Sequence, residues 1–118
     1  MPALSIDAIF EAAVRIQLRE DRFISLNLSR DSIAVKFPTT RRLADFLGVP
    51  HYYVLPFFAI MEQDELVTRA ERVGILTTEK GSRKYFDLLR SDPYRPEAED
   101  LLGRIIFDEL LKKIFREP

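Results

Sequence analysis

Residues 40–81 read TRRLADFLGVPHYYVLPFFAIMEQDELVTRAERVGILTTEKG, and this stretch decides the fold. Ala44 suits the inner face of a first short helix, and Gly48 follows four residues later, where that helix must end. Such an end needs a left-handed backbone, which only glycine adopts freely. Val54 lies six residues beyond Gly48. This spacing predicts two helices that cross closely, with the angle between them filled by Leu43, Leu47, Val49 and Phe57.

The second half of the stretch predicts a β-hairpin. Residues 66–70 and 74–78 read as short strands, and residues 71–74 between them form a charged turn that contains a glycine. Two short strands joined in this way are typical of a hairpin. The run Thr78-Glu79-Lys80-Gly81 then opens a further helix, whose apolar side carries Tyr85, Phe86, Leu88 and Leu89.

This order of elements resembles the winged helix-turn-helix family of DNA-binding regulators. The resemblance rests on the helix pair, the hairpin and the Thr-capped helix, and it covers a little under half of the chain. It implies that the second helix enters the major groove of DNA. It also implies that the hairpin, called the wing, follows the phosphate backbone or enters the minor groove.

Two strands are expected ahead of the helix pair. Apolar and polar residues alternate at 23–28 and again at 33–37. The second strand stands where winged domains resembling this chain carry the strand that pairs with the wing. The first strand is extra, and it either widens the sheet or pairs with a partner chain. Pro38 ends the second strand, and Thr39 or Thr40 caps the helix that follows.

Helices are expected at both ends of the chain. Ser5 is a candidate N-cap for an amphipathic helix that reaches about Glu20. A break with two prolines at residues 91–96 precedes a last helix over about 97–115. The apolar residues of this last helix cover more surface than one small domain needs. We therefore expect this helix, alone or together with the N-terminal one, to form a twofold dimer.

The expected architecture is α+β and mainly helical. It is a winged helix-turn-helix domain with an extra N-terminal strand and with N- and C-terminal helices. Residues 1–92 form the winged domain with its N-terminal helix and hairpin. Residues 93–118 form the C-terminal helix, which is the dimerisation element of a homodimer.

Composition excludes several classes of protein. The chain has 118 residues, 47% of them hydrophobic, which suffices for one core. It has no cysteine and one histidine, so we expect no disulfide, no metal site and no cofactor. With no cysteine nucleophile, no Ser-His-Asp spacing and no phosphate-binding glycine loop, we expect no catalytic residues and no enzyme. The longest apolar run is too short for a bilayer and no signal peptide is recognisable, so we expect no membrane association and a cytoplasmic location.

The charge is unevenly distributed. A formal net charge of −1 argues against indiscriminate coating of nucleic acid. Between residues 66 and 90, however, six basic residues stand against three acidic ones, and after residue 90 seven acids stand against five bases. A locally basic wing on a neutral protein favours specific docking.

The candidate DNA-binding residues lie on the helix pair, on the wing and on the helix after it. Pro50 suits the first turn of the second helix, so the residues after it fall at the exposed end that enters the major groove. Hydroxyl and imidazole groups there can reach phosphates or base edges. Ordinary solvated surface is the alternative for these side chains. The candidates are Thr40, Arg41, Arg42, His51, Tyr52, Tyr53, Arg69, Arg72 and Lys84.

Two features weigh against an ordinary recognition helix. Pro56 falls where the interior of the helix should be, so the helix either kinks there or begins only near Leu55. The same segment contains no lysine or arginine, and it ends in Glu62, Asp64 and Glu65.

Two functions are therefore weighed. The leading hypothesis is a sequence-specific transcription regulator that binds double-stranded DNA as a dimer, at half-sites about one helical turn apart. The alternative is a winged helix that binds a protein partner and no DNA. Its docking patch would consist of Tyr52, Tyr53, Phe57 and Phe58.

Overall fold

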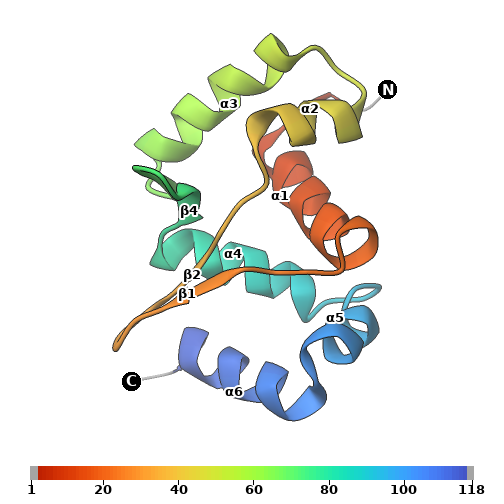
Figure 1. Cartoon of the computed structure of the whole chain (residues 1–118), viewed down its shortest axis with the longest axis vertical. Coiled ribbons are helices and arrows are strands. Elements are labelled where there is room, and N and C mark those ends of the chain that lie inside the picture. The colour runs from red at the N-terminus through yellow and green to blue at the C-terminus, as the bar shows by residue number, and fades with distance from the viewer. Residues whose placement is uncertain (1–2, 117–118) are drawn as a thin grey trace.

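A computed structural model describes residues 3–116 of the chain (Figure 1). The fold is α+β and mainly helical, as expected, with two separate antiparallel hairpins. In chain order the elements are α1 (Ile6–Arg15), the π-helical turn η1 (Ile16–Glu20), β1 (Leu26–Leu28), β2 (Ile33–Val35), α2 (Thr40–Leu47), α3 (His51–Gln63), β3 (Val67–Ala70), β4 (Gly74–Thr77), α4 (Glu79–Leu89), α5 (Arg95–Leu102) and α6 (Arg104–Ile114).

Helices α2 and α3 form the expected pair. Thr39 caps α2, because its hydroxyl accepts a hydrogen bond from the Arg42 amide at 3.1 Å. Gly48 ends α2 with a φ of +70°, in the left-handed region. Helix α3 begins at His51, directly after Pro50. The two helices contribute several buried residues to the core, namely Leu43, Ala44, Val54, Phe58 and Met61.

The strand that precedes α2 contacts the hairpin that follows α3. Strand β1 pairs with β2 of the same chain, and β3 pairs with β4. One antiparallel bridge, Lys36 opposite Leu76, joins the end of β2 to β4. At the same point the Phe37 amide donates a hydrogen bond to the Ile75 carbonyl at 2.8 Å. The expected pairing between these strands is thus present, although it is limited to this short contact.

Thr77 and Ser82 connect the β3–β4 hairpin to α4 and to β2. Both side chains are buried. The Thr77 hydroxyl accepts a hydrogen bond from the Val35 amide at 2.8 Å and lies 2.7 Å from the Ser82 hydroxyl. The Ser82 hydroxyl also donates to the Ile33 carbonyl at 2.5 Å. Because buried polar groups are costly unless they are bonded, these contacts hold the three elements in one arrangement.

Gly81 is required by a close backbone contact at the start of α4. A Cβ atom at this position would lie 1.9 Å from the Leu66 carbonyl oxygen. The Thr78 hydroxyl caps α4 by accepting a hydrogen bond from the Gly81 amide at 3.1 Å, and it donates to the Glu65 carbonyl. The run from Thr78 to Gly81 therefore fixes α4 against the connection between α3 and β3.

A buried polar bridge links α4 to the end of β2. The Tyr85 hydroxyl donates to the side-chain oxygen of Gln17, and the Gln17 amide group donates to the Lys36 carbonyl at 2.8 Å. Gln17 belongs to η1 and is buried. Burial raises the pKa of Tyr85, so the hydroxyl stays a protonated donor. The Lys36 carbonyl is thereby bonded to Gln17, whose side chain is fixed in turn by Tyr85.

The C-terminal region differs from the expected single helix over about 97–115. Two helices, α5 and α6, meet at Gly103, whose φ of +86° breaks the helical path. The apolar pattern continues on both sides of this glycine, which is why the sequence alone suggested one helix. The region shares the core cluster of the rest of the chain, to which it contributes Tyr94, Ala98, Phe107 and Ile114.

Polar contacts around Tyr94 attach α5 to α1 and η1. The buried Tyr94 hydroxyl accepts a hydrogen bond from Arg15 Nε at 2.6 Å and donates to Glu11 at 2.7 Å. Arg19 donates from two nitrogens to the Glu97 carboxylate, at 2.9 Å each. Its guanidinium also lies 5.2 Å from the centroid of the Tyr94 ring. The hydrogen bond from Arg19 lowers the pKa of Glu97.

We expect Gly81→Ala to destabilise the protein by about 3 kcal/mol or more, because the added methyl group meets a backbone carbonyl. Gly48→Ala is the matched control. No atom lies within 4 Å of a Cβ added there, so only the strain of a positive φ remains, about 1–2 kcal/mol. Urea denaturation of both variants measures the difference. Equal losses would contradict the steric explanation.

We expect Glu97→Gln to lower the free energy of unfolding at neutral pH by less than about 1 kcal/mol, the usual range for an exposed ion pair. The pKa of Glu97 is lowered in the folded state, so the pair stabilises the fold above the unfolded pKa of about 4.3. This stability is lost as the pH falls through the lower folded value. Denaturation at neutral and acidic pH checks this, and a variant equally destabilised at both would refute the ion-pair explanation.

Candidate nucleic-acid interface

The exposed side of α3 begins with two tyrosines. Tyr52 and Tyr53 are 66% and 52% exposed, and their rings meet edge to face with centroids 4.9 Å apart. Helical periodicity turns Val54, Phe58 and Met61 into the core instead. The first turn of α3 therefore presents two phenol side chains to solvent.

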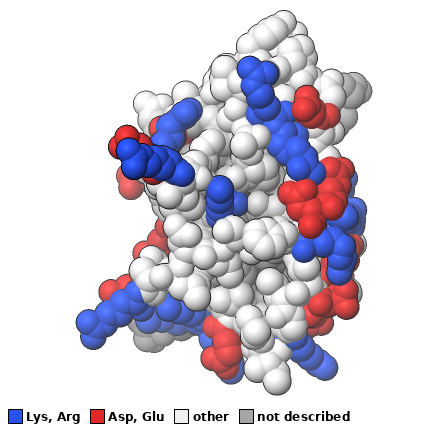
Figure 2. Space-filling view, viewed as in Figure 1, with Lys and Arg blue, Asp and Glu red and all other residues white. Residues whose placement is uncertain are grey.

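Between Tyr53 and Glu62, the exposed side of α3 is apolar. Four of its exposed residues are Leu55, Pro56, Ala59 and Ile60. No acidic or basic residue occurs in α3 before Glu62. Figure 2 shows this uncharged surface at the top of the molecule, where α3 begins in Figure 1. Phe58, which was expected in an aromatic docking patch, is buried, with its ring edge to face against Phe37.

Pro56 lies inside a continuous helix. The possibility that α3 begins only near Leu55 is wrong, because the helix runs from His51 to Gln63. Proline has no amide hydrogen, so the Tyr52 carbonyl, four residues earlier, loses its helical donor. Tyr52 and Pro56 are both exposed, so solvent can bond that carbonyl instead. The helix tolerates the proline because it lies on the outward side.

Thr40 and His51 were predicted as separate DNA contacts, and the structure brings them together. The Thr40 hydroxyl lies 2.7 Å from His51 Nε2, and the donor depends on the tautomer of the ring. This hydrogen bond joins the first residue of α2 to the first residue of α3. It orients the imidazole and leaves Nδ1 as the ring nitrogen that can meet a ligand.

Two of the predicted arginines are held by carboxylates. Arg42 donates to Glu20 at 2.9 Å and to Asp21 at 2.8 Å, and these hydrogen bonds raise the pKa of Arg42. Arg69 donates to Glu62 at 2.8 Å. A phosphate group would have to compete with these carboxylates for either guanidinium.

The remaining basic candidates fall into two places. Lys84 pairs with Asp7, so it lies beside α1 and apart from the other candidates. Arg41 and Arg72 are exposed, and among residues 3–116 neither takes part in an ion pair. Arg72 has a φ of +67° in the turn between β3 and β4. These two arginines can meet an anion without losing an internal partner.

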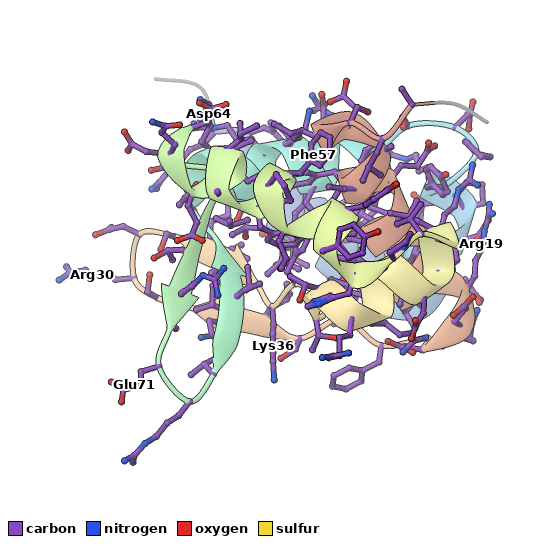
Figure 3. All side chains as sticks on the ribbon, turned by 90° about the horizontal axis from the view of Figure 1, so that it is seen from above. Arg19, Arg30, Lys36, Phe57, Asp64 and Glu71 are labelled. Atoms are coloured by element: carbon purple, nitrogen blue, oxygen red, sulfur yellow. The ribbon has the colours of Figure 1, made fainter. Side chains whose placement is uncertain are left out.

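Lys36 is a basic residue of this surface that sequence reasoning missed. It is exposed, and it forms with Leu76 the bridge that joins the end of β2 to β4. Figure 3 shows its side chain extending to the same side of the molecule as the hairpin turn at Glu71. The signal in the sequence was its polar position within the apolar alternation of residues 33–37, which turns it away from the core.

The described residues offer no metal centre. Between residues 3 and 116, no group of three or more His, Cys, Asp or Glu side chains is placed to hold a metal ion. In the same part of the chain, no helix is long and apolar enough to cross a membrane. No protein family, curated protein or solved structure matches the chain. The function is therefore inferred from the surface itself.

We expect Pro56→Ala to raise the free energy of unfolding by about 1–2 kcal/mol. Alanine restores a helical hydrogen bond, and the lost rigidity of proline in the unfolded chain offsets part of the gain. Leu55→Ala is the control, because it changes a neighbouring exposed residue without adding a donor. A Pro56→Ala variant that is no more stable than the parent protein would show that α3 already accommodates the proline without loss.

Proposed function

We propose that the chain binds double-stranded DNA as a winged helix-turn-helix protein, with α3 in the major groove and the β3–β4 hairpin on the backbone. The observation that carries this proposal is the bridge between Lys36 and Leu76. It ties the strand before the α2–α3 pair to the hairpin after it, which sets Lys36 and the hairpin turn on one side of the molecule (Figure 3). A recognition helix and a wing need this kind of fixed relation.

The side chains suit different parts of the duplex. Lys36, Arg41 and Arg72 supply positive charge for phosphates. Tyr52 and His51 can donate hydrogen bonds to phosphates or base edges from the start of α3. The apolar residues further along α3 can contact thymine methyl groups, which are the apolar feature of the major groove. This combination favours sequence-specific binding over non-specific electrostatic attraction. A protein that binds DNA in this way would act as a transcription regulator in the compartment that holds the DNA.

A second function is supported by one observation. The exposed side of α3 has no charged side chain before Glu62, although it exposes Leu55 and Ile60 at 41% and 42%. Uncharged surfaces that contain tyrosine are typical of protein interfaces. The same helix could therefore dock a protein partner in place of DNA.

The proposal is tested by fluorescence anisotropy with a random-sequence duplex three helical turns long, over a range of salt concentrations. The logarithm of the association constant falls linearly with the logarithm of the salt concentration. In the double variant Lys36→Ala with Arg72→Ala this fall should be less steep by about 2, one for each lost phosphate contact. Tyr52→Ala should weaken binding with little change in slope, because the phenol is neutral. Selection from the random pool then tests sequence specificity.

Arg104→Ala is the matched control. Arg104 is an exposed arginine at the start of α6, which lies at the opposite end of the molecule from α3 (Figure 1). This variant should leave both affinity and slope unchanged. If the parent protein does not bind the duplex even at low salt, DNA binding is rejected and the protein-docking function is favoured. If the double variant binds with the full slope, the proposed phosphate contacts of Lys36 and Arg72 are rejected.

A further inference from the structure

The most exposed large apolar side chain in the described part of the chain lies on α6, far from α3. Ile105 is 79% exposed and its neighbour Ile106 is 60% exposed. Leu28, at the end of β1, is 64% exposed. All three line one groove of about 480 Å³ between α6 and the β1–β2 hairpin. Three large apolar side chains together form an exposed apolar patch, and its contact with water is unfavourable in free energy.

The groove exists because α6 is tied to the hairpin at one end only. Near the C-terminal end of α6, Lys113 donates to the Ser29 carbonyl at 3.1 Å, and Arg116 donates to the Asp31 carbonyl at 3.4 Å. Ile105 and Ile106 lie at the other end of the helix. The inner side of α6 is already used, since Phe107 is buried in the core.

We propose that this groove is the contact between two copies of the chain related by a twofold axis. A twofold interface needs one surface that carries both a projection and a recess, because each copy gives and receives the same contact. Ile105 and Ile106 are the projection. The recess beside them is lined by Ile33, which is buried, and by Leu110, which is half-buried. Ile105 of one copy can therefore fill the recess of the other, and the reverse.

The charges around the groove are also self-complementary. Glu109, Lys112 and Lys113 line the same groove, and all three lie on α6. Glu109 and Lys112 pair within one copy at 3.5 Å and are both well exposed, so they can exchange partners at small cost. An antiparallel approach of two α6 helices brings the acid of one copy toward the lysines of the other.

The same features separate this surface from the apolar side of α3. The exposed side of α3 carries no acid or base before Glu62, so it has no self-complementary charges. Figure 1 places α6 and α3 at opposite ends of the long axis, which extends 39 Å. A dimer through α6 therefore leaves both copies of α3 uncovered, and it holds whether or not the chain binds DNA.

Sedimentation velocity of the full chain at micromolar concentration tests the proposal, without any DNA in the sample. We expect the parent protein to sediment as a dimer. Ile105→Glu with Ile106→Glu should weaken the dimer by about 100-fold or more, because two charges enter a desolvated contact. Leu55→Glu with Ile60→Glu is the matched control on α3 and should remain a dimer.

A charge reversal makes the test specific to the groove. Glu109→Lys should weaken the dimer by placing like charges opposite each other, and adding Lys112→Glu should restore it. Lys113 is left unchanged, because it holds α6 to the Ser29 carbonyl. Urea denaturation confirms that each variant is folded. A parent protein that stays monomeric, a dimer that survives the Ile105→Glu with Ile106→Glu change, or a dimer lost only in the α3 control would each overturn the proposal.

Discussion

The close approach of Gly81 to the Leu66 carbonyl determines how the rest of the molecule is arranged. This contact lets α4 start directly against the connection that leaves α3. Four residues before Gly81, the Thr77 hydroxyl accepts a hydrogen bond from the Val35 amide and so attaches β4 to β2. Helix α3, the β3–β4 hairpin and the strand before α2 are consequently positioned by one joint, and a bulkier residue at Gly81 would displace all three.

Most of the basic residues form ion pairs with carboxylates of the same chain. Arg19 attaches α5, Arg42 attaches α2 to the end of η1, and Arg69 attaches β3 to α3. Lys36, Arg41 and Arg72, by contrast, take part in no ion pair within residues 3–116. A chain with a net charge of −1 can in this way present a locally basic surface, because many of its acidic side chains form ion pairs with arginines elsewhere.

The sequence predicted the local features well and the long-range ones poorly. Gly48, the cap at Thr78 and the β3–β4 hairpin follow from short-range chemistry that acts within a few residues. The role of Lys36 depends on a bridge to a residue forty positions away, which no local pattern encodes. Gly103 was missed because apolar periodicity continued through it, and Pro56 because tolerance depends on which side of the helix meets solvent. The winged-helix function and the dimer stay predictions.

The placement of the four tyrosines gives the protein a natural optical readout. The chain has no tryptophan, so its ultraviolet fluorescence comes from these phenols. Tyr52 and Tyr53 lie on the open side of α3, whereas Tyr85 and Tyr94 are buried, and burial raises the pKa of each of the latter two. If an added ligand quenches the tyrosine emission while the protein stays folded, the change reports on Tyr52 and Tyr53. Emission changes that accompany unfolding include Tyr85 and Tyr94. Neither measurement needs an attached dye.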